Sequence, residues 1–188
     1  FMKKIFSLVV ASIVSFASFT QNQGSIQIAI LFDTSNSMDG LIDQAKSRIW
    51  AIVNTTSTLR YQGQIPKIEI ALYDYGNDNI GNANFVRQIT PFTTDLDFLS
   101  QKLFGLTTRG GSEFCGAVIS TSMTELAWNQ SPVALKMIYI AGNEPFNQGN
   151  VPYKEVCALA AKRNIQVNTI YCGEYQQGIT EFWYDGAQ

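Results

Sequence analysis

A carboxylate and two hydroxyls occupy alternate positions near the amino-terminal end of the chain: Asp33, Ser35 and Ser37. They directly follow the apolar run 26–32, which is rich in Ile and typical of a strand buried on both faces. Alternate side chains of an extended segment point the same way, so these oxygens converge at the strand's carboxyl end. Oxygen ligands completed by water suit hard cations such as Mg2+. The stretch therefore predicts a cation site, the alternative being a Ser-rich loop that caps the next helix.

The composition excludes most common routes to catalysis. The 188 residues include no His, which removes Ser-His-Asp triads, Cys-His pairs and His-ligated zinc. Neither G-x-x-x-x-G-K-[ST] nor G-x-G-x-x-G is present, so the common phosphate-binding loops are missing. A net charge of -2 without a basic block gives no indication of nucleic-acid binding. Hydrophobic content of 46% suits one globular domain with a buried core.

Hydrophobic periodicity predicts strands that alternate with helices. The predicted strands after the first are 67–75, 85–90, 134–140 and 165–173. The predicted helices are 41–59, a short one capped by Thr94, one from Ser112 to about Ala127, one from Tyr153 to Ala161 and one from Ile179 to Ala187. This order indicates an α/β, doubly wound, mostly parallel sheet with helices on both faces and 85–90 as an antiparallel edge strand. Such sheets place ligand sites at strand carboxyl ends, where the strand order reverses.

The Asp33-x-Ser35-x-Ser37 motif, after an apolar strand and before an amphipathic helix, resembles the von Willebrand factor type A (VWA) domain. In that family the motif begins the metal-ion-dependent adhesion site (MIDAS) of a Rossmann-like fold. The order of elements extends the resemblance over residues 27–187. In the family a Gly-Gly-Thr segment before a later helix supplies a third hydroxyl, and here Gly110-Gly111 precede Ser112. The resemblance therefore implies Ser112 as a metal ligand, and its alternative role is the helix N-cap.

The chain departs from the family where a second carboxylate is expected. The family usually has Thr-Asp-Gly after the strand that is predicted to end at Ile140, but Gly142 stands at the Asp position here. Asn143 and Glu144 are the candidate substitutes. The resemblance thus implies a degenerate MIDAS that binds Mg2+, or else Mn2+ or Ca2+, more weakly than a site with both carboxylates. On this reasoning Gly142→Asp is expected to strengthen cation binding.

Three cysteines, Cys115, Cys157 and Cys172, leave one thiol over if any disulfide forms. An exported chain permits disulfides. Cys157 is expected to begin a helix and Cys172 to end the strand that follows it, so both lie toward the same edge of the sheet. A disulfide between them is therefore a hypothesis, with Cys115 as an alternative partner for either. The other interpretation is three reduced thiols that act as small apolar side chains. Three cysteines without His disfavour a zinc site.

The first 20 residues have the pattern of a secretory signal peptide. Lys3-Lys4 precede the apolar run 5–19, which is shorter than the roughly 20 residues of a membrane span, and polar residues follow. We expect a signal peptide over 1–20, a VWA-like domain over 21–188 without a transmembrane span in the mature chain, and a periplasmic, envelope or secreted location. An uncleaved anchor is the alternative. The resemblance also implies a further strand and helix beyond the last predicted helix, so a truncated domain is expected.

The resemblance implies a protein-binding or adhesion module, and not an enzyme. In the family, the cation keeps one position open for an acidic residue of a protein partner. The competing hypotheses are a Mg2+-dependent hydrolase of the phosphatase type and a metal-free structural envelope protein. The hydrolase needs a second nearby carboxylate and a positioned Lys. Position 35 is Ser, and Lys136 lies inside a predicted strand, so the sequence favours the binding module.

Overall fold

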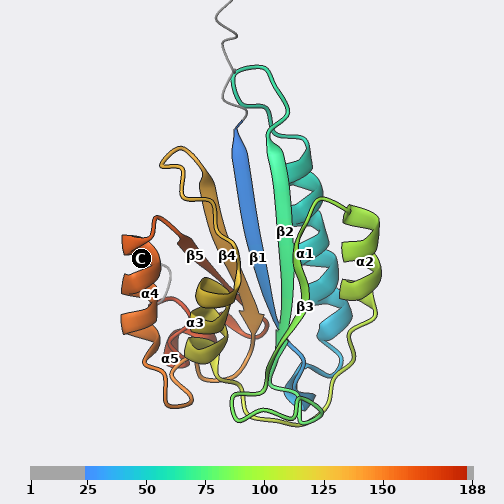
Figure 1. Ribbon diagram of the computed structural model, residues 1–188. Helices are drawn as coiled ribbons and strands as arrows, with labels where there is room; N and C mark the ends of the chain where they lie inside the picture. Colours follow the sequence, from blue (N-terminus) through green and yellow to red (C-terminus); the bar gives the residue numbers. More distant parts are fainter. Residues whose placement is uncertain (1–23, 186–188) are drawn as a thin grey trace, which may run out of the picture.

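The computed structural model describes residues 24–185, so the predicted signal peptide over 1–20 lies outside the described residues. Strands and helices alternate along the chain (Figure 1). In order they are β1 (Ser25–Asp33), the 3-10 turn η1 (Asn36–Met38), α1 (Ile42–Ser57), β2 (Lys67–Tyr75), β3 (Val86–Thr93), α2 (Leu96–Phe104), α3 (Cys115–Glu125), β4 (Leu135–Gly142), α4 (Tyr153–Lys162), β5 (Gln166–Tyr171) and α5 (Tyr175–Thr180).

The strands form one sheet in the order β3-β2-β1-β4-β5. β1 runs parallel to β2 and β4, β4 runs parallel to β5, and β3 is antiparallel at the edge. The chain moves outward from β1 to β2 and β3 and then returns to the other side of β1 for β4. This reversal places a topological switch point between β1 and β4, whose carboxyl ends lie together at the lower edge in Figure 1. The predicted fold class is confirmed.

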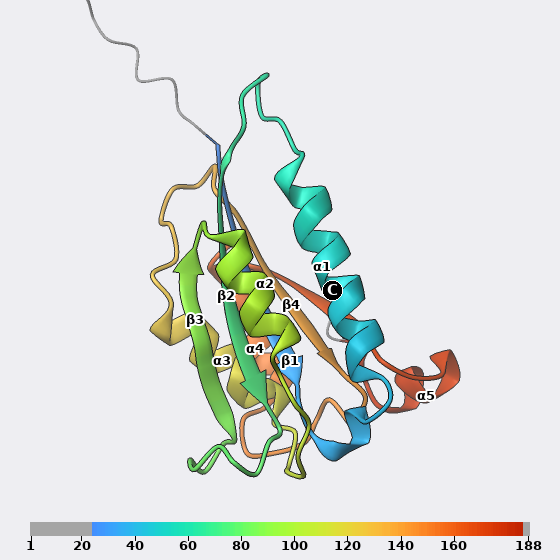
Figure 2. The same cartoon turned by 90° about the vertical axis from the view of Figure 1, so that its right-hand side faces the viewer.

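The central strand β1 is buried on both faces, as its apolar run predicts. Ile28 and Ile30 belong to the core formed with α1 and α2, whereas Ala29 and Leu31 belong to the core formed with α3 and α4. Successive strand side chains point to opposite faces, so one apolar run supplies both cores. The two helix pairs therefore cover opposite faces of the sheet (Figure 2).

The last helix differs from the prediction: α5 is Tyr175–Thr180 and does not begin at Ile179. The helix ends because Phe182 adopts a φ of 63°, in the left-handed region. The Trp183 backbone N–H then donates to the Gly178 carbonyl, the 6→1 hydrogen bond of a Schellman cap. Trp183 is thereby turned into the core, where it is fully buried.

Two other helices begin later than their patterns suggest. α3 begins at Cys115 with Phe114 as its N-cap, so Ser112 is not the cap. The cap of α2 is Asp95, whose side chain accepts from the Phe98 N–H at 2.9 Å, and not Thr94. The strand β4 in turn extends to Gly142, two residues past the predicted end at residue 140.

The hypothesised disulfide between Cys157 and Cys172 is not formed. Both thiols are free, as is Cys115. Cys157 packs against the core beneath α3 and α4, whereas Cys172 packs against the core beneath α1 and α2. The sheet therefore separates the two sulfurs, and the structure agrees with the alternative interpretation of reduced thiols.

Candidate functional site

Asp33 ends β1 at the switch point and is fully buried, with 0% exposure. Its Oδ1 accepts a hydrogen bond of 2.8 Å from the Ser35 backbone N–H. Its Oδ2 is buried and has no hydrogen-bond partner among residues 24–185. Burial raises the pKa of Asp33 to about 6, against the lowering effect of the Ser35 hydrogen bonds. Asp33 Oδ2, at the end of β1, therefore lacks the hydrogen-bond partner that buried polar atoms normally have.

The two predicted hydroxyl ligands lie together beside this carboxylate. Ser35 Oγ and Ser37 Oγ are 2.8 Å apart. Ser37 Oγ donates to Asn143 Oδ1 at 2.9 Å, and Asn143 Nδ2 donates to the Ser37 carbonyl at 2.9 Å. Asn143 follows β4, so its amide ties the β1 loop to the β4 loop across the switch point. The structure thus brings Asp33, Ser35, Ser37 and Asn143 into one cluster.

A second carboxylate, which the sequence analysis did not single out, lies against the same cluster. Glu113 is buried, at 7% exposure, in the segment between Gly111 and α3. A Cβ atom added to Gly76 would lie 3.0 Å from Asp33 Oδ1 and 3.0 Å from Glu113 Cγ, so both side chains pack on this glycine. Burial raises the pKa of Glu113 to about 7, with repulsion from Asp33 as the next cause.

Ser112, the predicted third hydroxyl ligand, is half-buried in the same segment. In the part of the chain that the structure describes, no hydrogen bond joins it to Asp33, Ser35 or Ser37. Glu144 is also half-buried, and its charge raises the pKa of both Asp33 and Glu113 after the larger effect of burial. Of the two candidate substitutes for the missing carboxylate, Asn143 therefore hydrogen-bonds to Ser37, whereas Glu144 acts on the cluster through its charge.

The position of the missing carboxylate is filled by other side chains. A Cβ on Gly142 would lie 2.6 Å from Tyr75 Oη, 3.0 Å from Asp33 Oδ2 and 3.0 Å from the Trp183 ring. Tyr75 is fully buried and donates from Oη to the Ala141 carbonyl at 3.1 Å. An aspartate at position 142 would therefore collide with a fixed phenol and an indole. We therefore expect Gly142→Asp to lower stability, while its effect on cation binding stays a prediction.

The donor set limits which cation the cluster can hold. The described residues contain no group of three or more His, Cys, Asp or Glu side chains with metal-binding geometry. The cluster instead offers carboxylate, hydroxyl and amide oxygens. Mg2+ is commonly held by one or two carboxylates and completes its shell with water, so these donors fit Mg2+ better than zinc. The buried, unpartnered Asp33 Oδ2 is the observation that makes a cation fit here.

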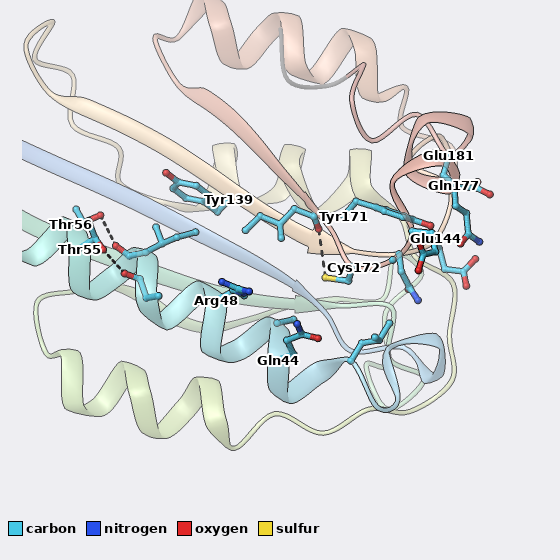
Figure 3. Close-up of a pocket in the computed structure, with 18 residues that line it drawn as sticks. Gln44, Arg48, Thr55, Thr56, Tyr139, Glu144, Tyr171, Cys172, Gln177 and Glu181 are labelled. Carbon is cyan, nitrogen blue, oxygen red and sulfur yellow. Dashed lines mark hydrogen bonds between the residues drawn. The ribbon is translucent and has the colours of Figure 1, made fainter.

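A groove of about 1130 Å³ begins beside the cluster and runs between α1 and the strands β4 and β5. Asn143 and Glu144 line it at the cluster end. Figure 3 shows Arg48 reaching in from α1, with Glu144 and Glu181 near the α5 end. The groove therefore places both signs of charge next to apolar side chains.

Neither a protein-family model nor a curated protein matches the sequence. Solved structures do share the fold. One is proximal thread matrix protein 1 from the mussel byssus with a zinc-occupied MIDAS motif, at TM-score 0.62 and 13% identity over 79% of this chain and 36% of that one. Another is the SpRpn10 VWA domain, at TM-score 0.60 and 18% identity over 87% of this chain and 82% of that one. A third is an aerotolerance-related membrane protein from Bacteroides fragilis NCTC 9343, at TM-score 0.58 and 17% identity over 79% and 68%.

The chain therefore has a VWA-type fold, as its motif and order of elements predict. Identities of 18% or less establish the fold alone. This chain spans about a third of the mussel protein's length, 36% of it. Within the described residues no helix has the length and apolarity needed to span a bilayer.

Proposed function

We propose that this chain is an extracytoplasmic protein-binding module that holds a divalent cation, Mg2+ by preference, at the carboxyl end of β1. The observation that carries the proposal is Asp33, fully buried with an unpartnered Oδ2. A buried anionic oxygen without a partner costs free energy, and a bound cation offsets that cost. Packing alone gives no reason to keep a carboxylate at this position.

The residues that would hold the cation are Asp33, Ser35 and Ser37. Ser35 Oγ and Ser37 Oγ are 2.8 Å apart, Asp33 Oδ1 accepts from the Ser35 backbone N–H, and Asn143 holds Ser37 in place. Ser112 stays a candidate hydroxyl ligand because it directly precedes Glu113 in the chain. A cation bound there acts as a Lewis acid with positions left for water or for a carboxylate from a partner. Mn2+ and Ca2+ also accept all-oxygen ligand sets and are the alternative ions.

A protein partner suits the surroundings of the cluster. The groove between α1 and the β4–β5 edge opens next to Asn143 and Glu144, so a partner segment in the groove reaches the cluster without leaving the surface. The signal-peptide pattern of residues 1–20 supports export. The same fold occurs in a membrane protein and in a byssus protein, which also supports it. A Mg2+-dependent hydrolase is the competing function, and a phosphatase assay with Mg2+ separates the two.

The test is capture of a partner from an envelope extract by the purified protein, with Mg2+ and with EDTA. We expect a saturable partner that is retained with Mg2+ and released by EDTA. Asp33→Asn removes the charge while preserving shape, and it should abolish retention. Retention that is identical with EDTA and in Asp33→Asn would contradict a cation-dependent interaction, and turnover of a phosphate ester would favour the hydrolase.

A further inference from the structure

We propose that Glu113 supplies the second carboxylate of the cation site, in place of the side chain that Gly142 lacks. The inference rests on the proposed cation binding, which it deepens by naming a ligand outside the predicted set. Glu113 belongs to the segment before α3, whereas the substitutes expected from the sequence, Asn143 and Glu144, follow β4.

Gly76 locates Glu113 relative to Asp33. This glycine follows β2 in a left-handed conformation with φ +76°, and its Cα faces the cluster. The position of an added Cβ is 3.0 Å from Asp33 Oδ1, 3.0 Å from Glu113 Cγ and 3.4 Å from Ser35 Cβ. Three side chains therefore converge on one point above the glycine. A larger residue at position 76 would separate the two carboxylates.

The backbone before α3 is held so that Glu113 turns inward. A Cβ on Gly111 would collide with the Gly76 carbonyl oxygen, so the two glycine segments pass in direct contact. Because α3 begins only at Cys115, Glu113 is not on the helix surface and lies in the connecting segment instead. Its side chain reaches the cluster with 7% of the residue exposed.

Glu113 is buried with no ion pair to a Lys or Arg in residues 24–185. The ion pairs present there join Lys46 to Asp43, Lys67 to Glu69 and Arg87 to Asp74. Acidic side chains are rarely buried unless they are paired or bind a metal. Two such carboxylates, Asp33 and Glu113, side by side repel each other, and a divalent cation is the group that offsets both charges.

Position 142 cannot supply this charge because its space is occupied. Tyr75 Oη and the Trp183 ring lie within 2.6 Å and 3.0 Å of where a Cβ would be. Glu144, the other acidic residue after β4, is half-buried and lines the groove. The backbone carbonyl of Glu144 accepts a 2.7 Å hydrogen bond from Trp183 Nε1, which fixes the Glu144 main chain. Glu113 is the buried carboxylate that remains.

The experiment is calorimetric titration of Mg2+, repeated with Mn2+ by electron paramagnetic resonance, into the purified chain and two matched variants. Glu113→Gln removes the charge of the proposed ligand, and Glu144→Gln removes the charge of the half-buried glutamate that lines the groove. We expect Glu113→Gln to weaken cation binding by about tenfold or more, since charge count tunes affinity at oxygen sites, and Glu144→Gln to change it much less. Thermal unfolding with EDTA checks folding, and we expect Glu113→Gln to melt no lower than the parent.

The outcomes separate the inference from the proposal on which it rests. If the parent binds both ions and Glu113→Gln binds them equally well, Glu113 is not a ligand while the cation site stands. If Glu144→Gln causes the larger loss, the second carboxylate comes from the β4 loop and the inference is wrong. If the parent itself binds neither ion, the proposed cation site fails, and the inference fails with it.

Discussion

Asp33→Asn should stabilise the cation-free protein at neutral pH. Burial raises the pKa of Asp33 from 3.8 to about 6. Each pKa unit corresponds to about 1.4 kcal/mol, so keeping this side chain charged costs the folded state on the order of 3 kcal/mol at pH 7. Asn removes the charge and keeps an oxygen that can accept from the Ser35 N–H. The new amide N–H groups need partners, so the expected net gain is about 1–3 kcal/mol.

The assay is urea unfolding with EDTA, and Asp74→Asn is the matched control. Asp74 is also a buried aspartate in a strand, at 1% exposure, but Arg87 donates to both of its carboxylate oxygens at 3.1 and 2.6 Å. Removing that satisfied charge should destabilise the protein, the opposite of the effect at Asp33. If Asp33→Asn unfolds at lower urea than the parent without cation, the reasoning from an unpartnered carboxylate is refuted.

The remaining predictions concern pH, position 142 and the thiols. The folded-state pKa values of Asp33 and Glu113 are raised to about 6 and about 7. The stabilising contribution of their protonation is therefore complete below about pH 4 and is lost as pH rises through 6 to 7. With EDTA present, the free energy of unfolding should fall over that window, and it should fall less in Asp33→Asn. Gly142→Asp should lower the free energy of unfolding by about 1–3 kcal/mol or more through overpacking against Tyr75, measured in urea, and a variant as stable as the parent would contradict this. Thiol titration of the unreduced, denatured protein should find three thiols, whereas one would indicate a disulfide.

The fold could be predicted because its determinants are local. The apolar run before Asp33 has no polar face, so it had to be a strand with helices on both sides. The alternation of helices and strands then allowed few topologies. The same motif placed Asp33, Ser35 and Ser37 at the strand end, where the structure has them.

The rest of the site depends on contacts between distant segments. Glu113 enters the cluster because Gly111 passes against Gly76, an approach that periodicity cannot show. Gly142 is required because Trp183, 41 residues later in the chain, fills the adjacent space. A Glu directly after the third hydroxyl position, in a chain that lacks the second Asp, was the signal available in the sequence.

The most direct test of the account is a Mg2+ titration of thermal unfolding at pH 7.5 for the parent and Asp33→Asn. A ligand that binds only the folded state stabilises it by RT ln(1 + [L]/Kd), so the parent's melting temperature should rise steadily with millimolar Mg2+ and fall back on addition of EDTA. Asp33→Asn should melt higher than the parent in EDTA and should not respond to Mg2+. A parent whose melting temperature is unchanged by Mg2+, Mn2+ and Ca2+, and which shows no heat of binding, would contradict the cation site.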